Sequence, residues 1–117
     1  MILGIHHFAI IISSASYLSF YEKLGFHEFF RKKRQYDTVV LMYGHGIQIE
    51  VFIDPRHPPR DSKMENLGLR HLALRVDDIE RTSKELNLEM ESVKLDWTGV
   101  NFCFIKDPDG NILELHE

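Results

Sequence analysis

Hydrophobic and polar positions follow two different periods along the first half of the chain. A β-branched apolar run at residues 4–12 predicts a strand, and hydrophobic side chains at helical spacing from residue 17 to residue 24 predict a helix. Ser14 offers a hydroxyl that can cap the start of this helix, and Gly25 can end it in the left-handed conformation. Further segments rich in β-branched and aromatic residues are predicted to be strands: residues 26–30, 38–43 and 47–53. The predicted order is therefore β-α-β-β-β.

The same order of elements recurs in the second half. The pattern predicts a strand, then a helix that an aspartate caps, then three strands: residues 67–76, 77–86, 91–95, 100–105 and 112–116. A constant offset of 64 residues aligns the two halves, because it places Gly4 on Gly68, His7 on His71 and Glu50 on Glu114. We interpret this as an internal repeat of about half the chain.

The repeat defines the predicted organisation. Residues 1–54 form a first module and residues 67–117 a second, and the two are expected to share one structural domain. Residues 55–66, rich in proline and charge, are predicted to be a surface linker.

Composition narrows the class of protein. The chain has 117 residues, with 14 basic and 18 acidic side chains and a net charge of -4, which favours neither nucleic acid nor membrane as a partner. The single cysteine, Cys103, excludes an internal disulfide and a multi-cysteine metal site, and it predicts a reducing, cytoplasmic setting. The apolar run near the start ends at Ile12 and has no basic flank, so we expect neither a signal peptide nor a membrane span.

The residues that suggest chemistry are a histidine and a glutamate at the same positions in both modules. Each glutamate lies between two aliphatic residues, so its side chain is expected to point away from the core. A single histidine or glutamate in a strand is more often a packing or surface residue than a metal ligand. Only the repetition of both residues at the same positions in the two modules favours a metal site. Two imidazoles and two carboxylates form a site for a divalent transition metal: nickel, zinc, cobalt, manganese or iron. The set is His7, Glu50, His71 and Glu114.

Two adjacent histidines near the start compete for the role of ligand. In a strand, neighbouring side chains point to opposite faces, so His6 and His7 are not expected to line the same interior. The 64-residue offset pairs His7 with His71 but pairs His6 with Arg70. His7 is therefore the predicted ligand, and His6 is predicted to be a packing or surface residue.

Several motifs resemble the vicinal oxygen chelate superfamily, also called the glyoxalase, bleomycin resistance and dioxygenase superfamily. They span essentially the whole chain: IHHFAII, YEKLGF, GIQIEVF, GLRHLALRVDDI and DPDGNILELHE. The resemblance implies an α+β fold in which paired β-α-β-β-β modules curl into an open barrel of mixed sheet around a metal, with the helices outside. It also implies that the ligands are His7, Glu50, His71 and Glu114, with nickel or zinc as the first candidate metals.

A set of four ligands is similar to that of bacterial glyoxalase I, whereas dioxygenases and fosfomycin-modifying members generally use three. The resemblance therefore implies a lyase or isomerase that acts on a small α-oxygenated carbonyl compound, or its thiol adduct, through a metal-stabilised enediolate. Glu114 is the expected base and Glu50 its partner. There are two alternatives. One is another enzyme of the superfamily, such as a CoA-thioester epimerase or a dioxygenase, and the other is a non-catalytic protein that binds a small molecule or antibiotic. A homodimer is expected, with the modules paired within one chain or between two.

Departures from glyoxalase I concern the thiol and the rest of the substrate. Members of that group commonly hold glutathione with an arginine and an asparagine at positions that correspond here to Ile11 and Asp54. The sequence therefore does not identify glutathione as the thiol of the substrate. Arg75 lies four residues after His71 and on the same strand face, where it is a candidate to neutralise an anionic substrate; the competing interpretation is a solvated arginine at a strand end. His116 shares a face with Glu114, and either lines the cleft or frays at the terminus.

Overall fold

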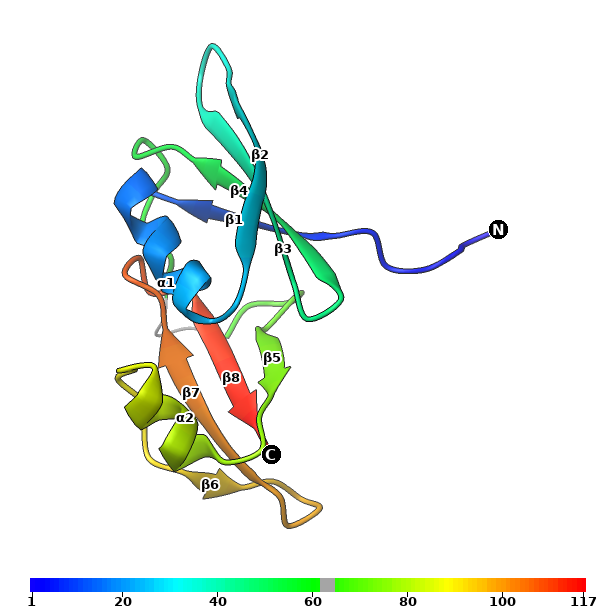
Figure 1. Ribbon diagram of the computed structural model, residues 1–117, viewed down its shortest axis with the longest axis vertical. Helices are drawn as coiled ribbons and strands as arrows, with labels where there is room; N and C mark the ends of the chain where they lie inside the picture. The colour runs from blue at the N-terminus through cyan, green and yellow to red at the C-terminus, as the bar shows by residue number, and fades with distance from the viewer. Residues whose placement is uncertain (62–64) are drawn as a thin grey trace. The chain divides into compact units, whose positions relative to one another are not determined.

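Two four-stranded mixed sheets, one in each half of the chain, form the frame of the computed structural model, which describes residues 1–61 and 65–117 (Figure 1). The chain divides into two units, residues 1–58 and 59–117. The expected α+β class is confirmed, and neither sheet closes into a barrel within the described residues. The division into two modules of one domain stays a prediction, and residues 62–64 of the predicted linker lie outside the described residues.

The first unit contains two helical segments and four strands in the predicted order. They are β1 (Phe8–Ile12), η1 (Ala15–Tyr17), α1 (Leu18–Lys23), β2 (His27–Lys33), β3 (Thr38–Gly44) and β4 (Ile47–Ile53). The strand order in the sheet is β1-β4-β3-β2, with β1 parallel to β4 and the other neighbours antiparallel. The two neighbours β1 and β4 therefore begin and end at the same edges of the sheet.

Local sequence explains where the elements of this unit begin and end. The Ser14 hydroxyl accepts a hydrogen bond from the Ser16 N–H, which caps the 3₁₀ turn that leads into α1. Gly25 follows α1 with a φ of 96°, a conformation that costs other residues a Cβ clash. His45 and Gly46, with φ values of 53° and 76°, form the two-residue turn between β3 and β4, as expected for a tight hairpin.

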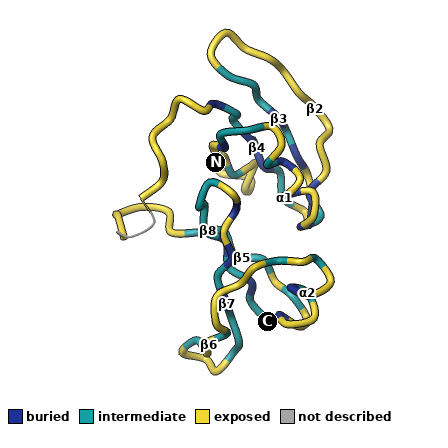
Figure 2. The backbone as a smooth tube through the Cα atoms, turned by 90° about the vertical axis from the view of Figure 1, so that its left-hand side faces the viewer, coloured by how far each residue is buried: buried dark blue, intermediate teal, exposed yellow. Residues whose placement is uncertain are grey.

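Alternation along the strands separates a core face from an open face. Ile49 and Val51 on β4 are buried, whereas Glu50 between them is only partly buried. Figure 2 shows β4 as buried and intermediate, in contrast to the exposed strand β2. On the core face the sheet packs with the buried Leu18 and Tyr21 of α1. Burial of these large apolar side chains supplies the main driving force for folding of the unit and leaves the opposite face for function.

The second unit repeats this plan with shorter strands. Its elements are β5 (Leu72–Arg75), α2 (Ile79–Glu85), β6 (Lys94–Leu95), β7 (Asn101–Lys106) and β8 (Ile112–His116). Asp78 caps α2 as predicted, because its carboxylate accepts a hydrogen bond from the Arg81 N–H. The strand order β5-β8-β7-β6 matches that of the first sheet, element for element.

Strand register reproduces the 64-residue offset. Ala9 lies opposite Glu50 in the parallel pair of the first sheet, and Ala73 lies opposite Glu114 in that of the second. The internal repeat is thus present in hydrogen-bonding register as well as in sequence. Each glutamate reaches the same position on the open face of its own sheet.

The strands differ in length from the prediction. Residues 4–7 and 67–71 precede β1 and β5 but are not part of these strands. Each of the two strands pairs with a single neighbour, so it extends only over the residues that pair with that neighbour. The strand expected at 91–95 is reduced to two residues, and β2 extends to Lys33. Among the described residues, no helix is long and apolar enough to cross a membrane.

Candidate metal centre

The first predicted ligand pair is formed within the first unit. His7 Nε2 lies 3.3 Å from Glu50 Oε2, and the two side chains are 34% and 24% exposed. His7 directly precedes β1, and Glu50 lies on the neighbouring strand β4 at the register position of Ala9. The parallel pairing of β1 and β4 therefore places an imidazole nitrogen and a carboxylate oxygen side by side on the open face.

The second pair repeats this arrangement within the second unit. His71 Nε2 lies 3.7 Å from Glu114 Oε1, with the side chains 19% and 14% exposed. The ring of His71 also packs edge-on against Phe104, with 5.4 Å between ring centroids. Phe104 lies opposite Glu114 in the β7–β8 register, so an aromatic wall borders this pair.

The donor atoms fit a transition metal ion. Two ligands bound to one metal at about 2.1 Å lie about 3.0 Å apart in octahedral geometry and about 3.4 Å apart in tetrahedral geometry. The observed separations of 3.3 and 3.7 Å are close to these values, so small side-chain rotations suffice to seat an ion at either pair. Neutral imidazole and carboxylate together suit nickel, zinc, cobalt, manganese or iron.

Each pair supplies half of the predicted donor set. Across residues 1–61 and 65–117, no group of three or more His, Cys, Asp or Glu side chains is close enough to hold a metal. The structure thus brings His7 to Glu50 and His71 to Glu114. A shared site for all four residues stays a prediction.

His6 does not behave as the strand pattern predicted. It was expected on the face opposite His7, but the strand begins only at Phe8, and both histidines precede it. The exposed His6 ring instead meets the His7 ring, with 2.8 Å between the two Nδ1 atoms. One of these nitrogens donates and the other accepts, so His6 is positioned to fix the tautomer of His7.

A third histidine pair adjoins Glu114 and was not predicted. His116 Nε2 lies 3.0 Å from Asp96 Oδ2, and its Nδ1 lies 2.9 Å from the Glu117 carbonyl oxygen. The hydrogen bond with Asp96 is the main cause of a raised pKa at His116. The Asp96 carboxylate has a lowered pKa, chiefly because it accepts a hydrogen bond from the backbone N–H of Val100.

The prediction for His116 left two alternatives, and the structure excludes fraying: the residue ends β8 with both ring nitrogens engaged. Asp96 was missed because its role depends on a turn. The motif DWTG carried a signal, since an aspartate two residues before a threonine commonly accepts hydrogen bonds from the following backbone.

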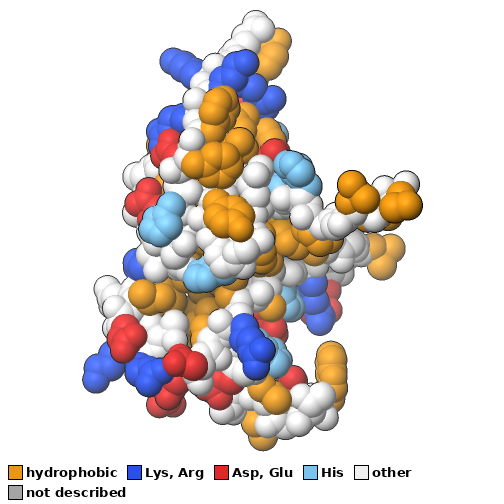
Figure 3. Space-filling view, turned by 45° about the vertical axis from the view of Figure 1, so that its right-hand side comes forward, with side chains coloured by type: hydrophobic (Ala, Val, Ile, Leu, Met, Phe, Trp, Pro, Cys, Tyr) orange, Lys and Arg blue, Asp and Glu red, His pale blue; other side chains and the backbone are white. Residues whose placement is uncertain are grey.

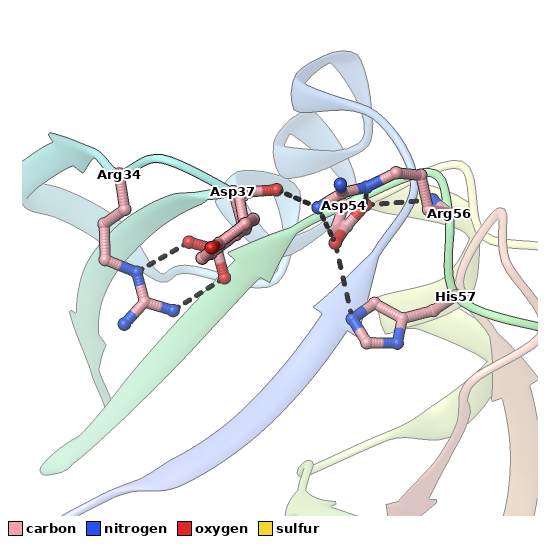
Figure 4. A network of polar contacts seen from close by, with 6 residues as sticks. Arg34, Asp37, Asp54, Arg56 and His57 are labelled. Atoms are coloured by element: carbon pink, nitrogen blue, oxygen red, sulfur yellow. Dashed lines mark hydrogen bonds and ion pairs between the residues drawn. The ribbon is translucent and has the colours of Figure 1, made fainter.

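Asp54 is engaged in a polar network at the end of β4 (Figure 4). Arg56 donates hydrogen bonds of 2.9 Å to both of its carboxylate oxygens, and His57 Nε2 lies 3.6 Å from Oδ2. The Arg56 side chain is the largest cause that lowers the pKa of Asp54 from 3.8 to about 2. Nearby, Arg34 forms a bidentate pair with Asp37. The Asp54 carboxylate, at the position that corresponds to a glutathione-binding asparagine of glyoxalase I, is therefore already bound by Arg56.

Comparison with other proteins adds close relatives over the full length. The chain is 39% identical to YaeR of Escherichia coli (strain K12), with 97% of the chain and 95% of that protein covered. It is 36% identical to YwkD of Bacillus subtilis (strain 168), with 100% and 98% covered. The crystal structure of a glyoxalase family protein from Enterococcus faecalis matches with a TM-score of 0.88 and 38% identity over 97% of both chains.

More distant structures share the fold at lower identity. Lactoylglutathione lyase from Agrobacterium tumefaciens matches with a TM-score of 0.68 and 20% identity over 97% of this chain and 92% of that one. A variant of the fosfomycin resistance protein FosX from Listeria monocytogenes, solved with Mn(II) and a dihydroxypropylphosphonic acid, matches with a TM-score of 0.70 and 19% identity over 99% and 93%. The family model of the glyoxalase/bleomycin resistance protein/dioxygenase superfamily matches residues 4–115. The chain therefore belongs to this superfamily.

Proposed function

We propose that this chain is a metal-dependent lyase or isomerase of the glyoxalase I type, acting on a small α-oxygenated carbonyl compound or its thiol adduct. The observation that carries the proposal is the His–Glu pair that recurs in the same register of both sheets. In this proposal the two pairs together bind one divalent metal, nickel or zinc first. Both pairs belong either to one chain or to two chains of a homodimer.

A divalent metal held by His7, Glu50, His71 and Glu114 would supply Lewis acidity, which would stabilise negative charge on two neighbouring substrate oxygens. The residues of the chain move the proton. Glu114 removes a proton from the carbon next to the carbonyl and returns it to the adjacent carbon. Glu50, on the equivalent position of the other sheet, serves as its partner and as a ligand. Phe104 shields the second pair from water on one side.

The occupied state of Asp54 favours a thiol other than glutathione, or a substrate with no thiol. Its carboxylate already accepts three hydrogen bonds from Arg56, two from the side chain and one from the backbone N–H. Ile11, at the position where an arginine would be expected, is 45% exposed and offers no charge. Neither residue is therefore suited to hold the glutathione carboxylates.

Metal content provides the first test. Purified protein loaded with nickel or zinc and dialysed should retain close to one ion for each set of four ligands, measured by mass spectrometry of the metal. The variants His7→Gln and His71→Gln should both lose it if the two pairs share one ion. Retention of a full ion by either variant would contradict a shared site.

Turnover provides the second test. Methylglyoxal hemithioacetals formed with glutathione and with other thiols should be assayed, with Glu114→Gln as the active-site variant. Glu85→Gln, on the exposed surface of α2, removes the same charge away from the site and serves as the matched control. Loss of turnover in both variants, or in neither, would remove Glu114 from its proposed role.

The four-ligand set also separates the lyase from the alternatives. A dioxygenase or another three-ligand member should keep most of its metal affinity in the variant Glu50→Gln, whereas a four-ligand lyase should lose affinity. A protein that only binds a small molecule needs no metal, so its affinity for the ligand should not change on treatment with a chelator.

A further inference from the structure

Arg75 lies on the same open face as the second ligand pair. It ends β5, two residues beyond Ala73, which is opposite Glu114 in the parallel register. A rise of about 3.3 Å per residue puts it roughly 6.6 Å along the strand from that level. An arginine at this distance reaches a substrate bound beside Glu114 without contacting the ligand pair itself.

The guanidinium group of Arg75 has no ion-pair partner among the described residues, and acidic side chains near it along the chain and the sheet are engaged elsewhere. Glu114, on the neighbouring strand, pairs with His71. Asp77 pairs with Arg81 on α2. Glu117 accepts hydrogen bonds from a backbone N–H and from an asparagine side chain. Asp96 is bound by the terminal histidine of β8 and by its own turn.

The lack of an ion-pair partner among the described residues distinguishes Arg75 from Arg31 and Arg34, which lie in or beside the strands of the first unit. Arg31 is bidentate to Glu28, and Arg34 is bidentate to Asp37. An arginine with a carboxylate partner is already neutralised, whereas an exposed arginine without one can accept a carboxylate from a ligand through its two parallel N–H groups.

The position equivalent to Arg75 carries no cation in the first unit. The guanidinium of Arg34 lies over the Phe52 ring of that unit, 5.3 Å from the ring centroid, but it is already paired with Asp37. The 64-residue offset places Ile11 at the position of Arg75, and Phe52 at that of the histidine which pairs with Asp96. Figure 3 shows hydrophobic side chains gathered on the surface of the first unit. Exposed apolar residues there include Phe29, Phe30 and Tyr43. The two open faces thus differ in charge although their ligand pairs are alike.

We propose that Arg75 determines specificity by binding a carboxylate group of the substrate, so that the substrate is an α-oxygenated carbonyl compound that also carries a carboxylate on a short spacer. This inference rests on the proposed function, since the carboxylate binds beside the metal-binding oxygens of the same molecule. Arg75 takes no part in proton transfer.

Two hydroxamates test the inference by binding alone. Acetohydroxamate and succinohydroxamate chelate a metal through the same two neighbouring oxygens, but only the second carries a carboxylate on a two-carbon spacer. Titration calorimetry of the nickel-loaded protein should show about tenfold tighter binding of succinohydroxamate, equivalent to about 1.4 kcal/mol. Arg75→Gln should abolish this preference and leave acetohydroxamate binding unchanged, and Arg75→Lys should keep part of it.

Arg81→Gln removes an arginine from the same unit and should keep the full preference, as the matched control. Equal affinity of the wild-type protein for both hydroxamates, or a preference that survives in Arg75→Gln, would overturn the inference while the metal site stands. Loss of nickel from Arg75→Gln would also overturn it, because Arg75 would then support the site and not select the substrate. A wild-type protein that binds no nickel would refute the proposed function, and this inference with it.

Discussion

Substitution of the two adjacent histidines tests which of them is the metal ligand in the proposed site. His7 and His6 are both exposed and both precede β1, so neither substitution removes a core contact. His7 Nε2 faces Glu50 at 3.3 Å, whereas His6 contacts the other ring nitrogen of His7, Nδ1, through its own Nδ1. His7→Gln therefore removes a donor atom, and His6→Gln removes a hydrogen-bond partner of that donor.

The expected magnitudes follow from these positions. Loss of an outer partner of a metal-bound histidine typically costs about 10–100-fold in affinity, so loss of the ligand itself should cost at least about 100-fold, or roughly 2.7 kcal/mol. Glutamine at position 6 still offers an oxygen that can accept from the His7 N–H. The cost of His6→Gln should therefore stay within about tenfold. Because both side chains are exposed, the free energy of unfolding of the metal-free protein should change by less than about 0.5 kcal/mol in either variant.

Competition against a chromophoric chelator measures the nickel affinity of wild type and both variants, and urea unfolding of the metal-free forms checks their stability. Equal losses of nickel affinity in the two variants would show that His6 and His7 contribute together, or that both substitutions act by disturbing the fold. A larger loss in His6→Gln than in His7→Gln would refute the assignment of His7 as the ligand.

Four further outcomes are expected. If the proposed function is right, Glu114→Gln should lower turnover by about 10²–10⁴-fold in steady-state assays of the metal-loaded protein, and the Glu85→Gln control should not. Chelation of a metal present at about 100 times its dissociation constant should lower stability by about 2.7 kcal/mol, seen as a fall in Tm; an unchanged Tm would argue against a bound ion. The pKa of Asp54 is lowered to about 2, so the stability that its ionised form contributes is complete above about pH 4 and is lost as the pH falls toward 2. Acid titration followed by circular dichroism should show this loss in the wild-type protein but not in Asp54→Asn. Gly25→Ala should lower the free energy of unfolding by about 1–3 kcal/mol, measured in urea, because Gly25 has a φ of 96° and an added Cβ would lie 2.7 Å from His45 Nε2. A variant as stable as the wild-type protein would contradict this strain.

The fold was largely predictable because the repeat and the alternation of apolar residues are local properties of the sequence. The aliphatic neighbours of Glu50 and Glu114 are buried, as the period of two predicted, and this alone fixes the face of each carboxylate. The short length of β5 was not predictable, because it depends on how far its single neighbour β8 runs beside it. Strand ends are set by pairing, which is a tertiary property.

The candidate site was predictable only in part. The two His–Glu pairs followed from the repeat, and both lie within their own units, whereas their role as metal ligands stays a prediction. The pairing of Asp96 with His116 was not foreseen, because it joins a turn to the end of another strand over 20 residues. The contact of His6 with His7 was missed for a different reason, since the strand pattern was extended over residues that do not join the strand.

The alanines opposite the two glutamates have a consequence for how freely those carboxylates rotate. Ala9 and Ala73 place only a methyl group beside Glu50 and Glu114, on the neighbouring strand. A methyl group neither donates a hydrogen bond nor blocks a change of rotamer, so the alanine does not restrain the side-chain torsions of the glutamate beside it. In the proposed reaction, this leaves each carboxylate room to take one position as a metal ligand and another as a base, and a larger side chain at residue 9 or 73 should restrict it to one.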